Sequence, residues 1–582
     1  MLIAPPSDSG SQLMVIETGL AAIAAAVAFG WPRLGSGFFS RIEHFFGHLA
    51  RRKGLAVVTV GASTLLLRLA LLPLFPIPKP FAPDDFSFLF AADTFEHGRL
   101  TNPTPDMWVH FETIHITMKP TYMSMYFPGQ GLVLAAGKAL LGHPWYGVLC
   151  SSALMSAAIC WMLQAWLPPT WALLGGLLAV IRLGLFSYWI NTYTGAGTTS
   201  ALAGALVLGA LPRFMNGARL RHSLLLATGA AILAITRPYE GMLLCLPVAF
   251  VLGRWLLIGK NRPSARVLIR ATPPVLLIVA AISWMGYYNY RAFGNPLTMP
   301  YTIDRATYAM APLYIWQPRR PALVYRHESL RRFYCQFESL KLAKPQTISS
   351  LFHEALLKYW SGLLFFVGPA LFAPLIMLRR VFLDRRFRFL FVCVLVLIAG
   401  ISVEFFTIAH YLAPFTAALY AIALQAMRHL RVWNPEGRPV GLALVRLTLA
   451  VCFALAGLRA FAEPLHLSPQ QWPAGGWLWQ WYGPGHYGED RARVEAELKH
   501  IEGKQLAIVR YTPEHYGFDE WVYNDADIDG SKVIWAREMD AANNSDLFRY
   551  YKDRKVWLVE PDTHPVRLSA YPVKAQLPPG TE

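Results

Sequence analysis

Three groups of polar side chains stand out from a sequence that is otherwise strongly apolar. Each group lies at the edge of an apolar run, and the groups are Asp84 with Asp85, Arg237 with Glu240, and His410 with Tyr411. Carboxylates can take up or release protons during a reaction. The planar fork of an arginine suits a phosphate, which offers several acceptor oxygens. These residue types therefore indicate chemistry that moves protons and binds anions.

The acid pair directly follows Pro83 and opens the segment FSFLFAADTFEHG, which has the pattern of an amphipathic helix. Consecutive residues of a helix point about 100° apart, so only one of two adjacent acids can face a given pocket squarely. Four apolar side chains of the segment could face lipid: Phe86, Leu89, Phe90 and Phe95. We therefore expect the acids to lie at the surface of a membrane.

Arg237 stands immediately before a proline, in the run TRPYEG. Pro238 lacks a backbone donor and restricts the residue before it, so a helix should end here and the arginine should emerge beside the break. Two roles fit Arg237: an ion pair with Glu240, or binding of an anionic phosphate. An exposed ion pair contributes only about 0–1 kcal/mol. The phosphate role therefore explains better why a charge is placed near the bilayer.

Other charged side chains lie within or beside apolar runs, and these are Arg68, Arg182 and Glu404. A charge inside a membrane span usually faces the protein interior or a water-filled cavity. Arg68 could instead extend toward the lipid headgroups. His410 could bind a phosphate or a carboxylate, or it could simply be a histidine exposed in a turn.

Length and composition define the elements that must position these groups. The chain has 582 residues, of which 54% are hydrophobic and only 15% are charged, and its mean hydropathy is +0.34. A water-soluble fold with a polar surface does not reach that balance. A bilayer core of about 30 Å requires about 20 apolar residues in a helix. About twelve candidate spans lie near 13–31, 55–76, 144–166, 170–190, 197–212, 223–236, 240–258, 271–289, 360–378, 389–407, 411–428 and 442–462.

The formal net charge is +17, and the basic residues that produce it cluster in alternate short loops between the spans. Basic loops of membrane proteins stay in the cytoplasm, so this pattern argues for a topology and against nucleic-acid binding. Loops 51–53 and 379–388 are predicted inside. The parts predicted outside are loop 77–143 with the acid pair, the short turn near Asn191, the Arg237 turn, loop 290–358, the His410 turn and the tail from about 463. Within the first outer loop, residues 131–141 read as an interfacial helix.

The tail has charges of both signs and a different periodicity. Helix 489–501 and strands 505–511, 532–538 and 554–561 are expected, separated by polar turns. We therefore expect a membrane domain over residues 1–462 and a small α/β domain outside the membrane over 463–582. The tail lacks a glycine-rich phosphate loop, which favours a recognition or docking role over chemistry.

Short motifs of the first outer loop resemble a known group of membrane enzymes. They are Pro83-Asp84-Asp85, His97-Gly98-Arg99, Thr101-Asn102-Pro103, Lys119-Pro120 and Tyr126-Phe127-Pro128-Gly129. Together with Thr236-Arg237-Pro238 and the turn from His410 to Pro414, this pattern resembles the GT-C superfamily of integral-membrane glycosyltransferases. The likeness is greatest to bacterial relatives of protein O-mannosyltransferases and lipid A aminoarabinose transferases, and it covers about residues 55–430. Two motifs depart from the family: Asp85 stands where a glutamate is usual, and Lys119-Pro120 is followed by Thr121 instead of a second proline.

The resemblance implies a polyprenyl-phosphate-linked sugar as donor and a lipid, glycan or protein as acceptor, on the outer side of a bacterial cytoplasmic membrane. Asp84 would be the catalytic base, and Arg237, with His410 or Lys119, would stabilise the leaving phosphate. Asp85, Glu240 and Tyr411 would join the substrate site. No cofactor and no metal ligands are expected, although a divalent metal beside the acids stays open.

Two rival classes fit parts of the sequence. A transporter or lipid flippase would also have many helices, buried charges and a helix broken at a proline. Transporters typically show paired repeats and place polar groups at mid-depth, whereas here no repeat is visible and most of the notable polar residues lie at outer turns. A receptor or scaffold would instead use the tail domain as its working part. The pattern favours an enzyme with a site at the membrane surface.

Overall fold

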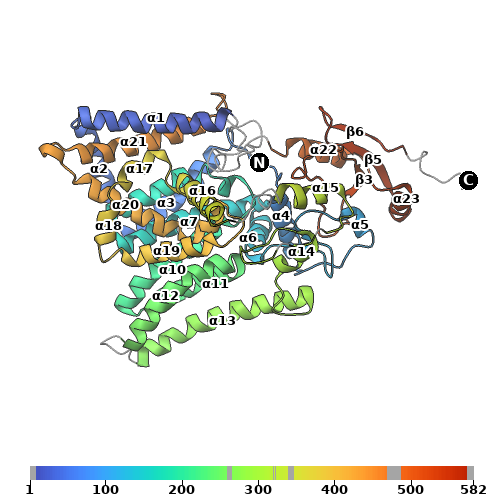
Figure 1. Cartoon of the computed structure of the whole chain (residues 1–582), viewed down its shortest axis with the longest axis horizontal. Helices are drawn as coiled ribbons and strands as arrows, with labels where there is room; N and C mark the ends of the chain where they lie inside the picture. The colour runs from blue at the N-terminus through green and yellow to red at the C-terminus, as the bar shows by residue number, and fades with distance from the viewer. Residues whose placement is uncertain are drawn as a thin grey trace, which may run out of the picture.

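The protein is mainly helical, with a bundle of long helices at one end and a small α/β domain at the other (Figure 1). The structure, a computed structural model, describes residues 8–258, 265–318, 320–321, 323–338, 347–467 and 487–572. Helices occupy every range in which a span is expected, and a sheet forms only in the tail and as one short pair in the first loop. The expected fold class, a helical membrane bundle with a small C-terminal α/β domain, is confirmed among these residues.

Eleven long helices build the bundle. They are α1 (Asp8–Gly30), α3 (Lys53–Ala70), α7 (Pro144–Trp166), α10 (Gly197–Gly217), α11 (Leu220–Thr236), α12 (Pro238–Ile258), α13 (Ala265–Phe293), α16 (Ile348–Phe366), α19 (Arg388–Ser402), α20 (Thr416–Arg431) and α21 (Val440–Ala460). Further helical segments connect them: α2 (Ser36–Arg51), α8 (Pro169–Ala179), η1 (Val180–Gly184), α9 (Tyr188–Asn191), η4 (Pro369–Leu371), α17 (Phe372–Leu375), α18 (Leu378–Leu383), η5 (Ala409–Phe415) and η6 (Pro435–Gly437).

Six helices of the described chain are both long and apolar enough to cross a bilayer: α1, α3, α7, α10, α12 and α21. A seventh span arises if α16 and the segment Pro369–Leu375 are taken as one helix bent by 85°, and three shorter apolar helices lie among them. These helices make the chain an integral membrane protein. Helices α2 and α18, next to the basic loops, lie at the end of the bundle away from the α/β domain (Figure 1). The orientation, with the basic loops inside and the α/β domain outside, stays a prediction.

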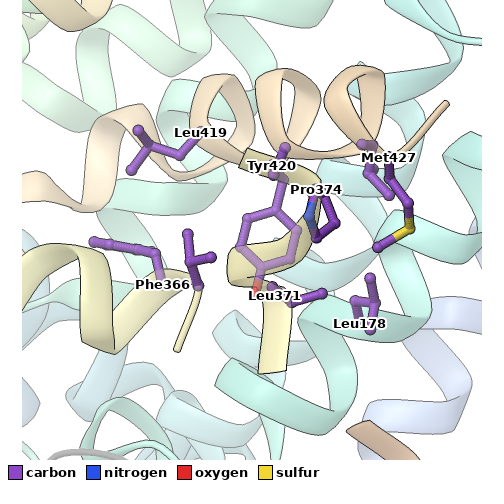
Figure 2. A pocket seen from close by; sticks show the side chains of 10 residues that line it. Leu178, Phe366, Leu371, Pro374, Leu419, Tyr420 and Met427 are labelled. Atoms are coloured by element: carbon purple, nitrogen blue, oxygen red, sulfur yellow. The ribbon is translucent and has the colours of Figure 1, made fainter. Parts of the chain in front are cut away.

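The bend after α16 occurs at Gly368, whose φ of +66° is one that residues with side chains rarely adopt. A small apolar pocket lies beside the bend (Figure 2). The residues that line it come from α8, from the end of α16 and the segment Pro369–Leu375 after the bend, and from α20. They are Leu178, Phe366, Val367, Leu371, Pro374, Leu419, Tyr420, Ala423, Leu424 and Met427. None of the polar residues singled out in the sequence lines this pocket. We therefore interpret it as a gap between packed helices and not as part of the candidate site.

Buried charges fasten helix α1 to the bundle. Glu17 of α1 is fully buried, and its carboxylate lies 3.5 Å from Arg182 Nη1 and 3.1 Å from Arg459 Nη2. It also accepts a hydrogen bond of 3.1 Å from the backbone N–H of Ala370, just past the bend. Arg182 thus faces the protein interior, as expected for a charge within a span.

Arg68 is also buried within the protein. Its guanidinium donates to the carbonyl of Phe75 at 2.8 Å and to Asn191 Oδ1 at 3.1 Å, and it lies 4.8 Å from the centre of the Trp145 ring. The alternative in which Arg68 extends to the lipid headgroups is therefore wrong.

The loops at the domain end contain several short elements. They are α4 (Pro83–Glu96), α5 (Trp108–Phe111), β1 (Ile116–Thr117), β2 (Met123–Ser124), α6 (Pro128–Leu141), α14 (Pro300–Tyr308), α15 (Glu328–Arg331) and η2 (Arg332–Phe337). Strands β1 and β2 pair antiparallel, with Thr117 opposite Met123. Helix α6 covers the range expected for an interfacial helix and packs on α4 and α7.

The C-terminal domain contains the expected helix and strands and two further elements. They are α22 (Glu489–His500), β3 (Lys504–Val509), β4 (Val533–Arg537), α23 (Ala541–Tyr550), β5 (Arg554–Glu560) and β6 (Arg567–Ala570). The sheet order is β4-β3-β5-β6, with β3 parallel to both neighbours and β6 antiparallel to β5. The boundary at 462/463 falls after α21 and before this domain, and it stays a prediction.

The two faces of the sheet pack on different partners because side chains alternate along a strand. Ala507 and Val509 share a cluster with α22, whereas Leu506 and Ile508 share one with Phe86 and Phe90 of α4. Phe86 and Phe90 are 7% and 4% exposed. The expectation that they face lipid is wrong, because the C-terminal domain covers this side of α4.

Replacing Glu17 by alanine should destabilise the protein strongly. The change removes the Glu17 carboxylate from the buried Arg182 and Arg459, and removing one partner of a buried ion pair costs about 3–5 kcal/mol. The measurement is the melting temperature of the purified protein in detergent. Thr18→Ala, at the exposed neighbouring position, is the control and should melt near the wild type. Equal melting temperatures for the two variants would contradict a structural role for Glu17.

Candidate active site

The acid pair occupies the first turn of α4, where the sequence favours a helix start. Pro83 is the first helical residue, and carboxylates are favourable at a helix N-terminus. Asp85 is fully buried; its Oδ2 accepts from the backbone N–H of Ala82 at 3.3 Å, and its Oδ1 accepts from that of Tyr193 at 2.9 Å. Burial raises the pKa of Asp85 to about 7. Asp85 thus fastens α4 to a distant turn and has no face toward solvent.

Asp84 points elsewhere and keeps 26% of its side chain exposed. Its Oδ1 accepts a hydrogen bond of 2.5 Å from the Tyr126 hydroxyl and lies 2.7 Å from His115 Nδ1. Its Oδ2 accepts one of 3.1 Å from the Thr194 hydroxyl. One acid of the pair is therefore structural and the other is accessible, as the helix geometry predicts.

The partners of Asp84 set its charge. Burial alone would raise the pKa of Asp84, but His115 and Tyr126 lower it well below its ordinary value. Burial would likewise lower the pKa of His115, but Asp84 raises it above 6.5. Both shifts favour an ion pair of carboxylate and imidazolium.

His115 is held in a strained backbone conformation. Its φ is +62°, which is uncommon for residues other than glycine and is found at functional sites. Its carbonyl accepts from the Ser87 hydroxyl at 2.7 Å and from the N–H of Met125 at 3.1 Å. The carbonyl before it, of Ile114, accepts from the Tyr523 hydroxyl at 3.2 Å. The strain is thus maintained by α4, by the β1–β2 region and by the C-terminal domain.

The turn of residues 193–196, between α9 and α10, joins the predicted groups. Gly195 and Ala196 have φ of +79° and +54°. Tyr193 and Thr194 donate to the acid pair, as described above, while the carbonyl of Gly195 accepts from Arg237 Nη2 at 3.1 Å. A Cβ on Gly195 would lie 2.4 Å from His410 Nδ1, so only glycine fits against that ring. The structure thus brings the acid pair, Arg237 and His410 to one turn.

Arg237 lies at the expected helix break, because α11 ends at Thr236 and α12 begins at Pro238. Its Nη1 forms the alternative ion pair with Glu240 at 3.0 Å, and its guanidinium lies 4.5 Å from the centre of the Tyr411 ring. The side chain of Arg237 keeps 15% exposure. The ion pair is therefore present, and it does not exhaust the five N–H donors of the guanidinium.

His410 is only 3% exposed, so the interpretation as an exposed turn histidine is wrong. Its Nδ1 lies 2.6 Å from the Tyr188 hydroxyl, which also accepts from the His410 backbone N–H at 3.0 Å. Lys119 lies elsewhere. It is exposed and its ammonium lies 4.3 Å from the centre of the Trp108 ring, and the described contacts do not bring it to Asp84.

Sequence reasoning missed His115 and Tyr126 as partners of Asp84, and it placed the turn that contains Thr194 and Gly195 outside without expecting its contacts with the predicted groups. The run TYTGAG of residues 192–197 carries a signal for this segment, since its glycines indicate a tight turn. Within the described part of the chain, no group of three or more His, Cys, Asp or Glu side chains is arranged to hold a metal ion.

The C-terminal domain contacts α4 beside the acid pair. Tyr523 stacks on Phe86 with ring centres 4.3 Å apart, and Arg491 lies between Phe86 and Trp535, at 4.6 Å and 4.7 Å from their ring centres. The N–H of Ala526 donates to Asp93 Oδ2 at 2.9 Å. The C-terminal domain therefore packs on the acid-bearing helix of the same chain, and the recognition or docking role expected for it stays a prediction.

No protein-family model matches the sequence, and no curated protein matches it. Solved structures with a similar fold include ArnT from Cupriavidus metallidurans in the apo state and bound to undecaprenyl phosphate, with TM-scores of 0.46 and 0.47. Each of the two ArnT chains has 13% sequence identity to this chain. The alignment covers 87% of this chain in both cases, and it covers 93% of the apo ArnT chain and 94% of the chain bound to undecaprenyl phosphate. An oligosaccharyltransferase from Archaeoglobus fulgidus is 11% identical over 87% of this chain and 69% of its own, with a TM-score of 0.44. Both proteins are GT-C membrane glycosyltransferases, the group that the motifs resemble. The likeness is distant and assigns no role to single residues.

Replacing His115 by glutamine should remove a pH-dependent part of the stability. The ordinary pKa values of Asp84 and His115 are 3.8 and 6.5, and between them both groups are charged in the folded and the unfolded protein. The pair therefore stabilises most in that window. Its contribution is lost as the pH rises through the raised pKa of His115, and at the acid end as the pH falls through the lowered pKa of Asp84.

The measurement is the melting temperature of wild type and His115→Gln across pH. The melting temperature of the wild type should exceed that of His115→Gln most at about pH 5–6, and this difference in melting temperature should become smaller at alkaline pH. His97→Gln, at an exposed position, serves as a control with little effect expected. A difference between wild type and His115→Gln that is constant across this range would show that the pair is not ionic.

Proposed function

We propose that the protein is an integral-membrane glycosyltransferase that moves a sugar from a polyprenyl-phosphate-linked donor to an acceptor on the extracytoplasmic side of a bacterial cytoplasmic membrane. The observation that carries the proposal is the convergence at the 193–196 turn of an accessible carboxylate, Asp84, with a guanidinium and an imidazole. A glycosyl transfer from a lipid phosphate needs these groups: one to take a proton and others to hold an anion. Asp84 lies at the start of α4, in the connection between the spans α3 and α7 and not within a span, which favours an enzyme over a transporter.

In the proposed reaction, the nucleophilic oxygen or nitrogen of the acceptor attacks the anomeric carbon of the donor sugar. A bond forms to that carbon, the bond from carbon to phosphate oxygen breaks, and the lipid phosphate leaves as an anion. Asp84 takes the proton of the nucleophile. In the resting site its pKa is low, which makes it a weak base. An acceptor that displaces His115 or Tyr126 from the carboxylate removes a cause of that lowering and raises its basicity.

Arg237 and His410 are the proposed ligands of the donor phosphate. Within the described structure Arg237 uses three of its five N–H donors, two toward Gly195 and one toward Glu240. The other two donors are assigned to phosphate, with Tyr411 supporting the guanidinium. His410 keeps Nε2 for the ligand, since Nδ1 is engaged with Tyr188. Lys119 is the less suitable cation because it lies on Trp108, and Glu240 serves to orient Arg237.

The neighbouring acids should respond differently to the same change. Asp84→Asn should abolish transfer, because the amide cannot take up the proton, and its effect on stability should be no larger than that of His115→Gln, which removes the same ion pair. Asp85→Asn replaces a fully buried carboxylate that accepts backbone N–H groups, and it should destabilise the protein by about 1–3 kcal/mol. Transfer is measured by mass spectrometry of cell-envelope lipids and glycans from cells that lack the protein and are complemented with each variant.

The paired design keeps the outcome interpretable, because protein abundance and melting temperature are measured for both variants. If Asp85→Asn abolished turnover in folded protein while Asp84→Asn remained near wild type, the assignment of the base would be reversed. If both variants left envelope lipids and glycans identical to those of the wild type, the glycosyltransferase proposal itself would fail.

Arg237 should contribute to the affinity for the donor phosphate. Hydrogen bonds to charged groups are worth about 1.5–3 kcal/mol, so Arg237→Ala should weaken binding of undecaprenyl phosphate by about 10- to 150-fold. Arg237→Lys keeps the charge but loses the fork and should have a smaller effect. Arg291→Ala, at an exposed arginine, tests for nonspecific loss of charge. Affinities of both Arg237 variants equal to wild type would make Arg237 purely structural.

A further inference from the structure

Helix α2 is held at the level where two membrane spans end. It connects α1, which ends at Gly30, to α3, which begins at Lys53. Residues 31–35 and Arg52 are the only links, so α2 cannot move far from the ends of these spans. It lies at the end of the bundle opposite the C-terminal domain (Figure 1). Its exposed side therefore faces the region where the surface of the bilayer must lie.

One face of α2 is fastened to the bundle. Glu43 accepts from Arg431 Nη2 at 3.0 Å and from Arg446 Nε at 2.9 Å, and Arg446 also donates to the Ser40 hydroxyl at 3.1 Å. Burial opposes the charge of Glu43, but the two arginines lower its pKa to about 2. Ala50, two turns further along this face, is fully buried. The orientation of α2 about its own axis is thus fixed.

A second face of α2 is apolar and uncovered in the described chain. Phe38, Ile42 and Phe45 are spaced as neighbours along one stripe of a helix, and they are 65%, 38% and 69% exposed. Exposed aromatic side chains in such a stripe are typical of a helix that lies in the interface of a bilayer.

A third face carries basic side chains beside that stripe. Arg41, His44 and His48 are all exposed and follow one another at helical spacing, and the rings of the two histidines lie 4.6 Å apart. Together with Ser40 and Phe45 they line a shallow concavity of the surface. The guanidinium of Arg41, the imidazole of His44 and the hydroxyl of Ser40 are donors suited to a phosphate group, while Nδ1 of His48 donates to the carbonyl of His44 at 3.0 Å.

We infer that α2 is an interfacial anchor and that the concavity of Ser40, Arg41, His44 and His48 binds the phosphate headgroup of an anionic phospholipid. Phe38, Ile42 and Phe45 enter the acyl region of the same leaflet. Charge complementarity supports this occupant, because Arg33, Arg51, Arg52 and Lys53 add further positive charge around the helix. The tethering of both ends to membrane spans favours the bilayer over a soluble partner or a second copy of the chain. The inference is independent of the proposed glycosyl transfer.

The first test compares the melting temperature of the full-length protein in nanodiscs of phosphatidylcholine with that in nanodiscs containing phosphatidylglycerol. The anionic lipid should raise the wild-type melting temperature, and this rise should shrink at high salt. The variant with Arg41→Ala, His44→Ala and His48→Ala should lose most of the rise. The control variant, with Arg219→Ala and Arg221→Ala in another basic loop, should keep it. If phosphatidylglycerol raised the melting temperature of the triple variant as much as that of the wild type, the proposed headgroup site would be wrong.

The second test uses single replacements that should leave folding intact. Phe45→p-benzoylphenylalanine should crosslink to phospholipid on illumination, and the lipid adduct is identified by mass spectrometry. The same replacement at Phe39, which lies below the guanidinium of Arg446 at 5.7 Å, should crosslink within the protein. A crosslink from position 45 to a second copy of the chain, or no lipid adduct there, would overturn the anchor.

Discussion

The backbone turn of residues 193–196 is the constraint on which the candidate site depends. Two consecutive residues with positive φ reverse the chain between α9 and α10, and the second of them, Ala196, pays a conformational cost that a glycine would avoid. The turn offers an N–H to Asp85, a hydroxyl to Asp84, a carbonyl to Arg237 and a surface without Cβ to His410. Since those partners come from α4, the α11–α12 break and η5, the turn fixes three distant segments relative to one another.

The acid pair illustrates how environment separates two identical side chains. Asp85 is fully buried and accepts hydrogen bonds from backbone N–H groups, and burial raises its pKa to about 7. Asp84, one residue earlier, keeps exposure and meets an imidazole, and its pKa falls. The sequence could predict that only one of the pair faces a pocket, because that follows from helix geometry alone. The sequence could not predict the contact between Asp84 and His115, because this contact depends on the strained backbone of His115, about thirty residues further along the chain.

The same distinction separates the parts of the fold that could be predicted from those that could not. Helices at the expected spans, the break at Pro238 and the strands of the tail follow from apolar periodicity and proline chemistry, which are local. The burial of Phe86 and His410 depends on what packs on them from elsewhere in the chain. The expectation that Phe86 faces lipid was wrong, and of the two alternatives for His410 the exposed turn histidine was wrong. Thr194 and Gly195 lie in a glycine-rich run whose tight turn was foreseeable, but its partners were not.

The C-terminal domain also restrains the acid site, through contacts with α4 and with the residue before His115. Tyr523 uses its ring to stack on Phe86, next to the acid pair, and its hydroxyl to hold the carbonyl before His115. One residue of the tail thus restrains both members of the Asp84–His115 pair. Arg491 supports the stack by lying between Phe86 and Trp535, where it also donates to the carbonyls of Trp521 and Tyr523. The distance between the carboxylate and the imidazole is therefore set jointly by the helical bundle, through the 193–196 turn, and by the C-terminal domain, through Tyr523.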